Sequence, residues 1–185
     1  TETSEKRGVY PFCMCPGGYV VNASSEEGRL AVNGMSYSGR NSANANSAVI
    51  ITITPEDYGD GTDPLSGVAF QRKMEEKAYQ IGNGKVPVER YGSFKRAVLG
   101  TRHQKPETTQ EESMGLEPIT PCIKGQWTEA PVHEILPDAL NHAFVEGMEA
   151  FGKKIHGFNG DEVLVEGIES RTSSPVRILR TESAQ

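Results

Sequence analysis

The first third of the chain alternates between short apolar runs and polar turns. Val9 to Cys15 and Tyr19 to Asn22 flank Pro16-Gly17-Gly18, so we expect two strands joined by a tight turn. Leu30 to Met35 predicts a third strand. Ala48 to Thr54 is a β-branched run, which is typical of a central strand buried on both faces. This part of the chain therefore predicts a sheet.

Two later segments show the spacing of an amphipathic helix. The first begins at Asp63, which suits a helix N-cap before Pro64, and closes at Gly82. The second begins after Pro137, preceded by a short turn, and ends at Gly152. In each helix the apolar residues fall on one face: Phe70, Met74, Ala78 and Ile81 in the first, and Ala139, Leu140, Ala143, Phe144, Met148 and Phe151 in the second.

The remaining segments are shorter or more polar. We expect Val86 to Val88 to be extended, Ser93 to Leu99 to form a short helix, and Gly100 to Gly125 to be a surface excursion. Glu162 to Ile168 and Pro175 to Leu179 predict two further strands. We therefore predict an α+β domain with a mainly antiparallel sheet, formed by the N- and C-terminal strands. A helical insertion would carry the two main helices, and it could form a subdomain over residues 63–157.

Charge and composition argue against two classes of partner. The formal net charge is −6 and no more than two basic residues are adjacent, so nothing predicts a nucleic-acid surface. No apolar run approaches the roughly 20 residues of a membrane span. The cysteines number three, and Cys13 lies too close to Cys15 to suggest a disulfide framework. This usage favours a reducing cytoplasm.

Cys13 and Cys15 are the sharpest chemical signal in the chain. In a strand they would share one face, with Met14 on the other. Two buried structural thiols, a redox-active pair and a metal clamp are all compatible with that arrangement. The spacing to Cys122 and to the histidines matches no common zinc pattern, so we assign no metal site.

Arginines at two other places suit a polar or anionic ligand. Arg40 and Asn41 lie in a loop of small polar residues, where an arginine can steer an anion. Arg171, Ser173 and Arg177 have the same parity, so on a strand they would face a ligand together.

Several longer motifs follow one another along the chain. Together they resemble a family of predicted FAD-utilising dehydrogenases, which are flavoproteins with two dinucleotide-binding domains and mostly no assigned substrate. The resemblance covers most of the chain and is weak only between about Asn83 and Trp127. The motifs that carry it are Cys13-Met14-Cys15-Pro16-Gly17-Gly18, Ala23-Ser24-Ser25-Glu26-Glu27-Gly28, Asn33-Gly34-Met35-Ser36, Ser38-Gly39-Arg40-Asn41, Asn44-Ala45-Asn46-Ser47-Ala48, Asp63-Pro64-Leu65, the helix-like Val68-Ala69-Phe70-Gln71-Arg72-Lys73, Leu136-Pro137-Asp138 and the run from Glu169 to Ile178.

The resemblance implies FAD as cofactor, yet the sequence lacks the Gly-x-Gly-x-x-Gly turn of a Rossmann domain. We therefore interpret residues 1–185 as the middle, substrate-side or cap domain of a larger flavoprotein. It would pack against Rossmann FAD-binding segments of the same polypeptide and, on its own, would be inactive and bind no FAD. The residues expected to face the ring system and a small-molecule substrate are Cys13, Cys15 and Arg40 as catalytic residues, Gly17, Gly18, Asn46, Ser173, Ser174 and Arg177 toward the cofactor, and Asn41 and Arg171 toward the substrate.

Two other functions fit the same residues. A non-catalytic binding or interaction module would use the polar loops to engage a protein or a carbohydrate. A small metalloprotein would use Cys13, Cys15 and Cys122 as ligands. Stoichiometric zinc or iron would distinguish the latter, and a neighbouring Gly-x-Gly-x-x-Gly segment would favour the flavoprotein.

Overall fold

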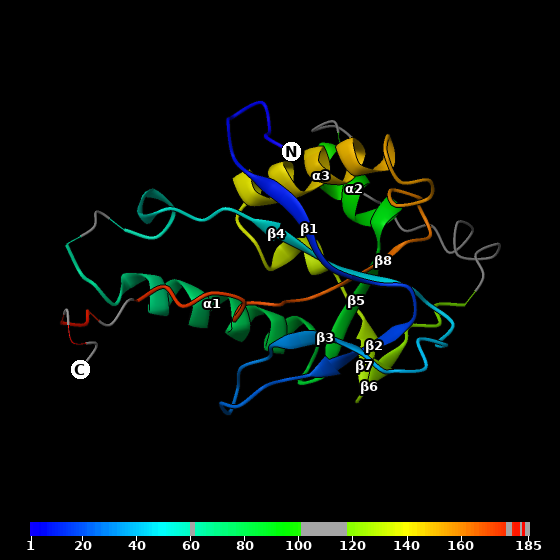
Figure 1. Ribbon diagram of the computed structural model, residues 1–185, viewed down its shortest axis with the longest axis horizontal. Helices are drawn as coiled ribbons and strands as arrows, with labels where there is room; N and C mark the ends of the chain where they lie inside the picture. Colours follow the sequence, from blue (N-terminus) through cyan, green and yellow to red (C-terminus); the bar gives the residue numbers. More distant parts are fainter. Residues whose placement is uncertain (60–61, 101–117, 177–178, 182, 184–185) are drawn as a thin grey trace.

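Strands and helices both contribute to the fold, as the sequence predicts. The computed structural model describes residues 1–59, 62–100, 118–176, 179–181 and 183. Within these residues the strands form three small sheets rather than a single one. The fold class is therefore α+β, and the prediction of one mainly antiparallel sheet is wrong (Figure 1).

The three sheets are built from eight strands of the described chain. The first pairs β1 (Val9–Cys15) with β4 (Asn46–Ile51) in antiparallel orientation. The second places β2 (Gly18–Asn22) between antiparallel β3 (Val32–Ser36) and parallel β6 (Ile123–Lys124). The third places β5 (Val86–Arg90) between parallel β7 (Trp127–Glu129) and antiparallel β8 (Leu164–Glu166).

Three of the expected strand positions are corrected by this topology. The strands on either side of Pro16 do not pair with each other, because β1 pairs with β4 up to Cys15, past an internal register shift, and the chain then crosses into another sheet. The central strand buried on both faces is β5, with Val86 and Val88 fully buried, whereas β4 is half-buried and pairs only with β1.

The C-terminal part also differs from the prediction. β8 is shorter than the expected strand over 162–168, and it joins β5 rather than the N-terminal strands. Pro175, Val176 and Leu179 belong to no strand, while residues 177 and 178 lie outside the described chain.

The helices lie close to where the hydrophobic period places them. α1 (Ser66–Ile81) starts two residues after Pro64, because Asp63 accepts a hydrogen bond from the Leu65 amide at 2.8 Å and closes a turn instead of capping the helix. Gly82 is its C-cap, as predicted. α3 (Asp138–Gly152) begins after Pro137 and follows a short 3-10 turn, η3 (Val132–Glu134), also as predicted. The expected short helix is α2 (Tyr91–Leu99), which begins two residues earlier than predicted, so the three α-helices of the described chain match the two main helices and the short one expected.

One hydrophobic cluster holds the three sheets and the helices together. It includes Leu30 beside β3, Met74 of α1, Val86 of β5, Phe94 of α2 and Met148 of α3. The range 63–157 therefore shares its main cluster with the rest of the chain. α2 and α3 lie together above the β1–β4 ribbon in Figure 1, and α1 lies apart from them with the C-terminal segment beside it.

α3 approaches the β1–β4 ribbon unusually closely at one point. A Cβ added at Gly147 would come within 2.5 Å of Val9 Cγ1. Val9 is fully buried and packs with Ala143 and Phe151 of the same helix. The missing side chain at Gly147 is therefore what lets this helix seat on the ribbon.

Candidate functional site

A cavity of about 1710 Å³ lies between the β1–β4 ribbon, α1, α3, β8 and the segment 167–175. Most of its lining side chains are apolar, including Val49 of β4, Phe70 of α1 and Phe144 of α3. Ligand pockets of roughly 300–1,000 Å³ with a few polar groups are usual for small molecules. This cavity is larger, so it has room for a cofactor ring and a substrate together.

The cavity brings together five of the residues that the sequence predicts for the site. Two come from the end of β1, one from the start of β4 and two from the C-terminal segment. They are Cys13, Cys15, Asn46, Ser173 and Ser174.

The two thiols at the end of β1 have different surroundings. The residue backbone at Cys13 is left-handed, with φ of 49°, and the strand alternation breaks there. As a result Cys13 is exposed while Cys15 is buried, and the predicted shared face does not form. The Cys15 thiol donates a hydrogen bond to the Gly17 carbonyl oxygen at 3.1 Å.

Gly17 and Gly18 serve close backbone approaches rather than an open surface. A Cβ at Gly17 would lie 2.4 Å from the Arg40 carbonyl oxygen, and one at Gly18 would lie 2.2 Å from the Met35 carbonyl oxygen. Arg40 and Asn41 thus pack their backbone against Gly17, with both side chains exposed. None of these four residues lines the cavity, so their predicted contacts with a ligand stay predictions.

Asn46 is the predicted site residue in the cavity wall whose side chain has an unused hydrogen-bond donor. It lies opposite Cys15 in the β1–β4 pairing and lines the cavity. Its Nδ2 atom is buried and donates to no group in the described chain. Because an unmade hydrogen bond at a buried polar atom costs about 1–3 kcal/mol, such an atom points to a ligand or to a further part of the protein.

Ser173 and Ser174 reach the cavity from its other end. The segment that carries them runs beside α1, away from the β1–β2 connection (Figure 1). The close approach of Pro175 to Gly67 holds it there, with 2.8 Å between a Cβ built on the glycine and the proline Cβ. No strand forms at 171–176, so the predicted alignment of Arg171 and Ser173 on one strand face is wrong, and Arg177 lies outside the described residues.

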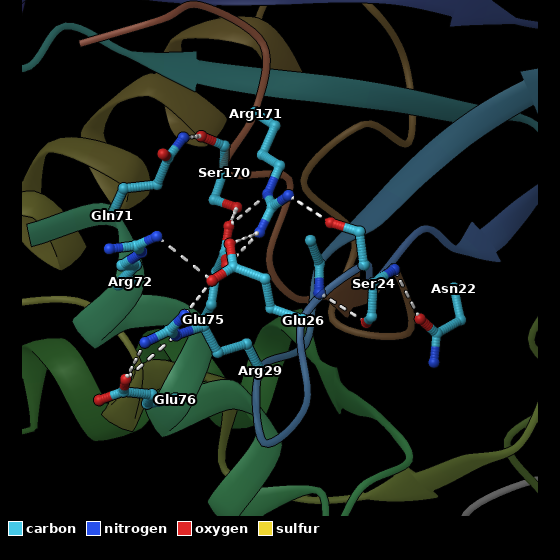
Figure 2. Close-up of polar contacts among 12 residues, drawn as sticks. Asn22, Ser24, Glu26, Arg29, Gln71, Arg72, Glu75, Glu76, Ser170 and Arg171 are labelled. Atoms are coloured by element: carbon cyan, nitrogen blue, oxygen red, sulfur yellow. Dashed lines mark hydrogen bonds and ion pairs between the residues drawn. The ribbon is translucent and has the colours of Figure 1, made fainter. Parts of the chain in front are cut away.

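Arg171 is the centre of a polar network instead (Figure 2). Its guanidinium donates to both carboxylate oxygens of Glu75 at 2.8 and 2.7 Å, to Ser25 Oγ at 2.6 Å and to Glu26 Oε1 at 3.1 Å. These four bonds use most of the five N–H donors that an arginine carries. Few of its N–H donors therefore remain for the predicted direct contact between Arg171 and a substrate anion.

Glu75 is the buried member of this network. Its side chain is 1% exposed, and it also accepts a hydrogen bond from Ser170 Oγ at 2.6 Å. Burial alone would raise the pKa of Glu75, but the hydrogen bonds from Arg171 and Ser170 outweigh it and hold the pKa below its ordinary value. The carboxylate is therefore ionised and fixes the start of the cavity-wall segment against α1.

The same network ties in the loop between β2 and β3. Glu26 also contacts Arg72 at 3.4 Å and pairs with Arg29, which in turn bonds Glu76 at 3.0 Å. The Ala23–Gly28 motif and the Glu169–Ile178 motif, far apart in the sequence, thus meet on one face of α1 (Figure 2). We call Ser25, Glu26, Glu75, Ser170 and Arg171 the Glu75 network.

A group that the sequence reading missed is Glu166, at the end of β8. It lines the cavity, and its Oε2 atom is buried without a hydrogen-bond partner in the described chain. Burial raises the pKa of Glu166 to about 7. Alternation along 162–168 would have placed it on a strand, but nothing local signals that its carboxyl group is unpaired.

Another buried carboxylate, Glu89 of β5, is fully engaged. Its oxygens accept hydrogen bonds from the His133 backbone amide at 3.0 Å and lie 2.8 and 3.0 Å from His133 Nδ1. The hydrogen bond to Glu89 raises the pKa of His133 above its ordinary value. This pair fixes η3 to the central strand and lies outside the cavity's polar set.

The described residues do not fit the diphosphate of FAD. A phosphate normally sits at a helix N-terminus that follows a strand and a glycine-rich turn. Here α2 follows β5 directly, and carboxylates stand at the starts of the other two helices, Asp63 before α1 and Asp138 in α3. The glycines at 82–84 and 157–160 follow helices rather than precede them. The described residues therefore supply no diphosphate site for FAD.

Two further features bear on the alternatives. Among residues 1–59, 62–100 and the rest of the described chain, no three His, Cys, Asp or Glu side chains are grouped so as to hold a metal ion. None of the helices described has both the length and the apolarity to cross a bilayer.

Fold and site define an α+β domain with a large, mostly apolar cavity and no phosphate cradle in its described part. The chain belongs to the family described as FAD-dependent protein, C-terminal domain-like, whose model matches residues 1–172. An uncharacterised protein of Clostridium beijerinckii is 43% identical to it over 182 residues. That match covers 97% of this chain and 32% of the relative, so the chain spans about a third of the relative's length. The resemblance to an FAD-dependent family is thereby confirmed.

Proposed function

We propose that this chain is the substrate-side domain of an FAD-dependent dehydrogenase. In this proposal, Rossmann segments elsewhere in the same polypeptide bind the FAD, and this domain covers the flavin ring and shapes the substrate pocket. Membership of an FAD-dependent family supports the cofactor. The poor fit of the described helix ends to a diphosphate supports a division of labour between the two parts of the protein.

The observation that carries the proposal is the cavity of about 1710 Å³, with five predicted site residues on its walls. Asn46 offers an unused amide donor, which suits the carbonyl oxygens and ring nitrogens of a flavin or a substrate. Cys13 and Cys15 lie at the same end of the cavity, where a thiol can contact a redox ring. The protein would thereby supply orientation and electrostatics, and the cofactor the electron chemistry.

Arg40 and Arg171 take different parts in this proposal. Arg40 stays a candidate for steering an anionic substrate, because its side chain is exposed while its backbone packs on Gly17. Arg171 acts as a positioning residue, because its bonds to Glu75 hold the wall that carries Ser173 and Ser174.

The proposal extends to the cellular compartment. All three cysteines are free thiols that line the cavity, two of them at the end of β1. Free thiols at a functional surface suit a reducing environment, so we place the protein in the cytoplasm.

The test is anaerobic flavin reduction by NADH or NADPH in the full-length protein, followed by flavin absorbance. Asn46→Leu should slow the reduction while the protein keeps its flavin, because the substitution removes a donor from the cavity wall. Asn22→Leu is the matched control, since Asn22 lies outside the cavity. Equal rates in the wild type and in both variants would remove this cavity from the flavin's surroundings.

The isolated 185-residue chain provides the complementary test. Because its described residues have no diphosphate cradle, it should elute from gel filtration without flavin after incubation with FAD. A yellow chain with stoichiometric FAD would contradict the proposed division of labour.

A further inference from the structure

Glu166 occupies a rigid position in the cavity wall. It pairs directly with Val88 across β5 and β8, and Val88 is fully buried. The next residue, Gly167, donates its amide hydrogen to the Pro87 carbonyl oxygen at 3.3 Å. The carboxyl group is therefore carried by a strand that is hydrogen-bonded to the central strand of its sheet rather than by a loop, which is what a binding group requires.

No charged group on the neighbouring elements forms a described hydrogen bond with Glu166 Oε2. Glu89 of β5 and His133 of η3 bond to each other, and Glu169 on the adjoining wall is a like charge that is half-buried. Arg90 of β5 also lines the cavity and is not without a partner. Among the described groups none contributes to the pKa of Glu166, for which burial is the cause. Below about pH 7 the carboxyl group is therefore protonated.

A protonated carboxyl group in an apolar cavity has one hydrogen to donate. Its Oε2 atom is buried and makes no hydrogen bond with the described chain, so this donor or acceptor capacity is unused. The cavity it lines is mostly apolar, with Val165, Ile168 and Phe70 among the lining residues and Arg90 and Glu169 among the charged ones. Such surroundings favour a neutral ligand over a charged one, because burying a charge without a partner is costly.

We propose that Glu166, in its protonated form, recognises the ligand of this cavity by donating a hydrogen bond to a neutral carbonyl group on an otherwise apolar molecule, such as an aromatic ketone or a quinone. The inference rests on the proposed function, in which the cavity holds the substrate. It adds the chemical class of that substrate and the group that selects it. Ionisation of Glu166 removes the donated hydrogen, and the resulting carboxylate repels a carbonyl oxygen.

The test is equilibrium dialysis of the full-length protein against two probes of nearly equal shape. 2-Acetonaphthone carries a ketone, and 2-ethylnaphthalene lacks it. Because the pKa of Glu166 is about 7, the wild type should bind the ketone about ten-fold more tightly at pH 6 than at pH 8. Its affinity for 2-ethylnaphthalene should not change between these pH values.

Three variants separate the donor from the cavity's shape and charge. Glu166→Gln keeps a hydrogen-bond donor that does not titrate, so it should still prefer the ketone, equally at both pH values. Glu166→Leu should bind the two probes alike. Glu169→Gln should keep the wild-type pH profile, because Glu169 has no buried unpartnered atom.

Several results would overturn the inference. They are a pH-independent affinity of the wild type for the ketone, a ketone preference that survives in Glu166→Leu, a profile abolished by Glu169→Gln, or failure of both probes to bind. Dialysis does not depend on flavin reduction, so the proposed function can fail separately. If Glu166 governs ketone binding while Asn46→Leu leaves flavin reduction unchanged, the inference stands and the proposed function falls.

Discussion

Loss of Arg171 should loosen one wall of the cavity. Arg171→Met keeps the aliphatic stem but removes four hydrogen bonds and leaves Glu75, 1% exposed, without its cationic partner. Breaking a buried ion pair costs about 3–5 kcal/mol. The Arg171 side chain is itself 38% exposed and Ser170 still donates to Glu75, so we expect the lower end, about 3 kcal/mol.

Hydrogen exchange in the intact protein measures this cost locally. The Val32 amide donates to the Ile168 carbonyl oxygen at 2.9 Å and reports on the wall next to the network. A loss of about 3 kcal/mol should speed its exchange about 100-fold in Arg171→Met. The Val86 amide, bonded to the Gln126 carbonyl oxygen at 2.9 Å in another sheet, should be unaffected.

A weaker arginine contact and the pH dependence serve as two controls for the Arg171 substitution. Arg72→Met removes a weaker contact, 3.4 Å long and made by a side chain that is 49% exposed, and should cost about 0.5 kcal/mol or less. The pKa of Glu75 is lowered in the folded protein, so the pair's contribution is present above the ordinary value of 4.5 and is lost as pH falls through the lowered pKa. The Arg171→Met deficit should therefore shrink toward pH 4. Equal effects of the two arginine variants, or a deficit independent of pH, would refute the central place of Glu75.

Three further substitutions test other parts of the structure. The pKa of Glu166 is raised from 4.5 to about 7, so its contribution to stability is fully present below pH 4.5 and is lost as pH rises through 7. Urea unfolding should therefore show that the wild type, relative to Glu166→Gln, loses about 3 kcal/mol of unfolding free energy between pH 4 and pH 8. The same pH dependence of stability in both proteins would contradict this. The raised pKa of His133 predicts that the stabilisation by its bond to Glu89 is present below pH 6.5 and disappears at alkaline pH. The difference in unfolding free energy between the wild type and His133→Gln should therefore narrow as pH rises. A difference that widens with pH would be inconsistent with the pairing. Gly147→Ala should lower the unfolding free energy by about 1–3 kcal/mol through its clash with Val9, and a stabilised variant would show that α3 does not seat there.

The helices could be predicted from the sequence because their signals are local. Apolar spacing and the punctuation by Gly82, Pro137 and Gly152 fall within the helices themselves or next to them. Strand pairing depends on residues far apart, and there the prediction failed. β1 pairs with β4, and β8 pairs with β5, from which two helices separate it along the chain.

The candidate site shows the same limit. Cys15 and Asn46 could be chosen by motif, yet only the β1–β4 pairing brings them together at the cavity. Arg171 could be recognised as a candidate from its motif. Its partner Glu75 lies 96 residues earlier in the chain and belongs to none of the motifs. Glu166 could not be recognised at all, since burial without a partner is a property of the packed structure.

The central claim is that this domain lies over a flavin held by the rest of the protein. Hydrogen exchange of the full-length protein, compared with and without FAD, tests it most directly. The account predicts slower exchange at residues 12–15 and 46–51, which form the ribbon side of the cavity, with no change in the outward-facing part of α1. FAD-dependent protection elsewhere in the protein, with these two segments unchanged, would contradict it.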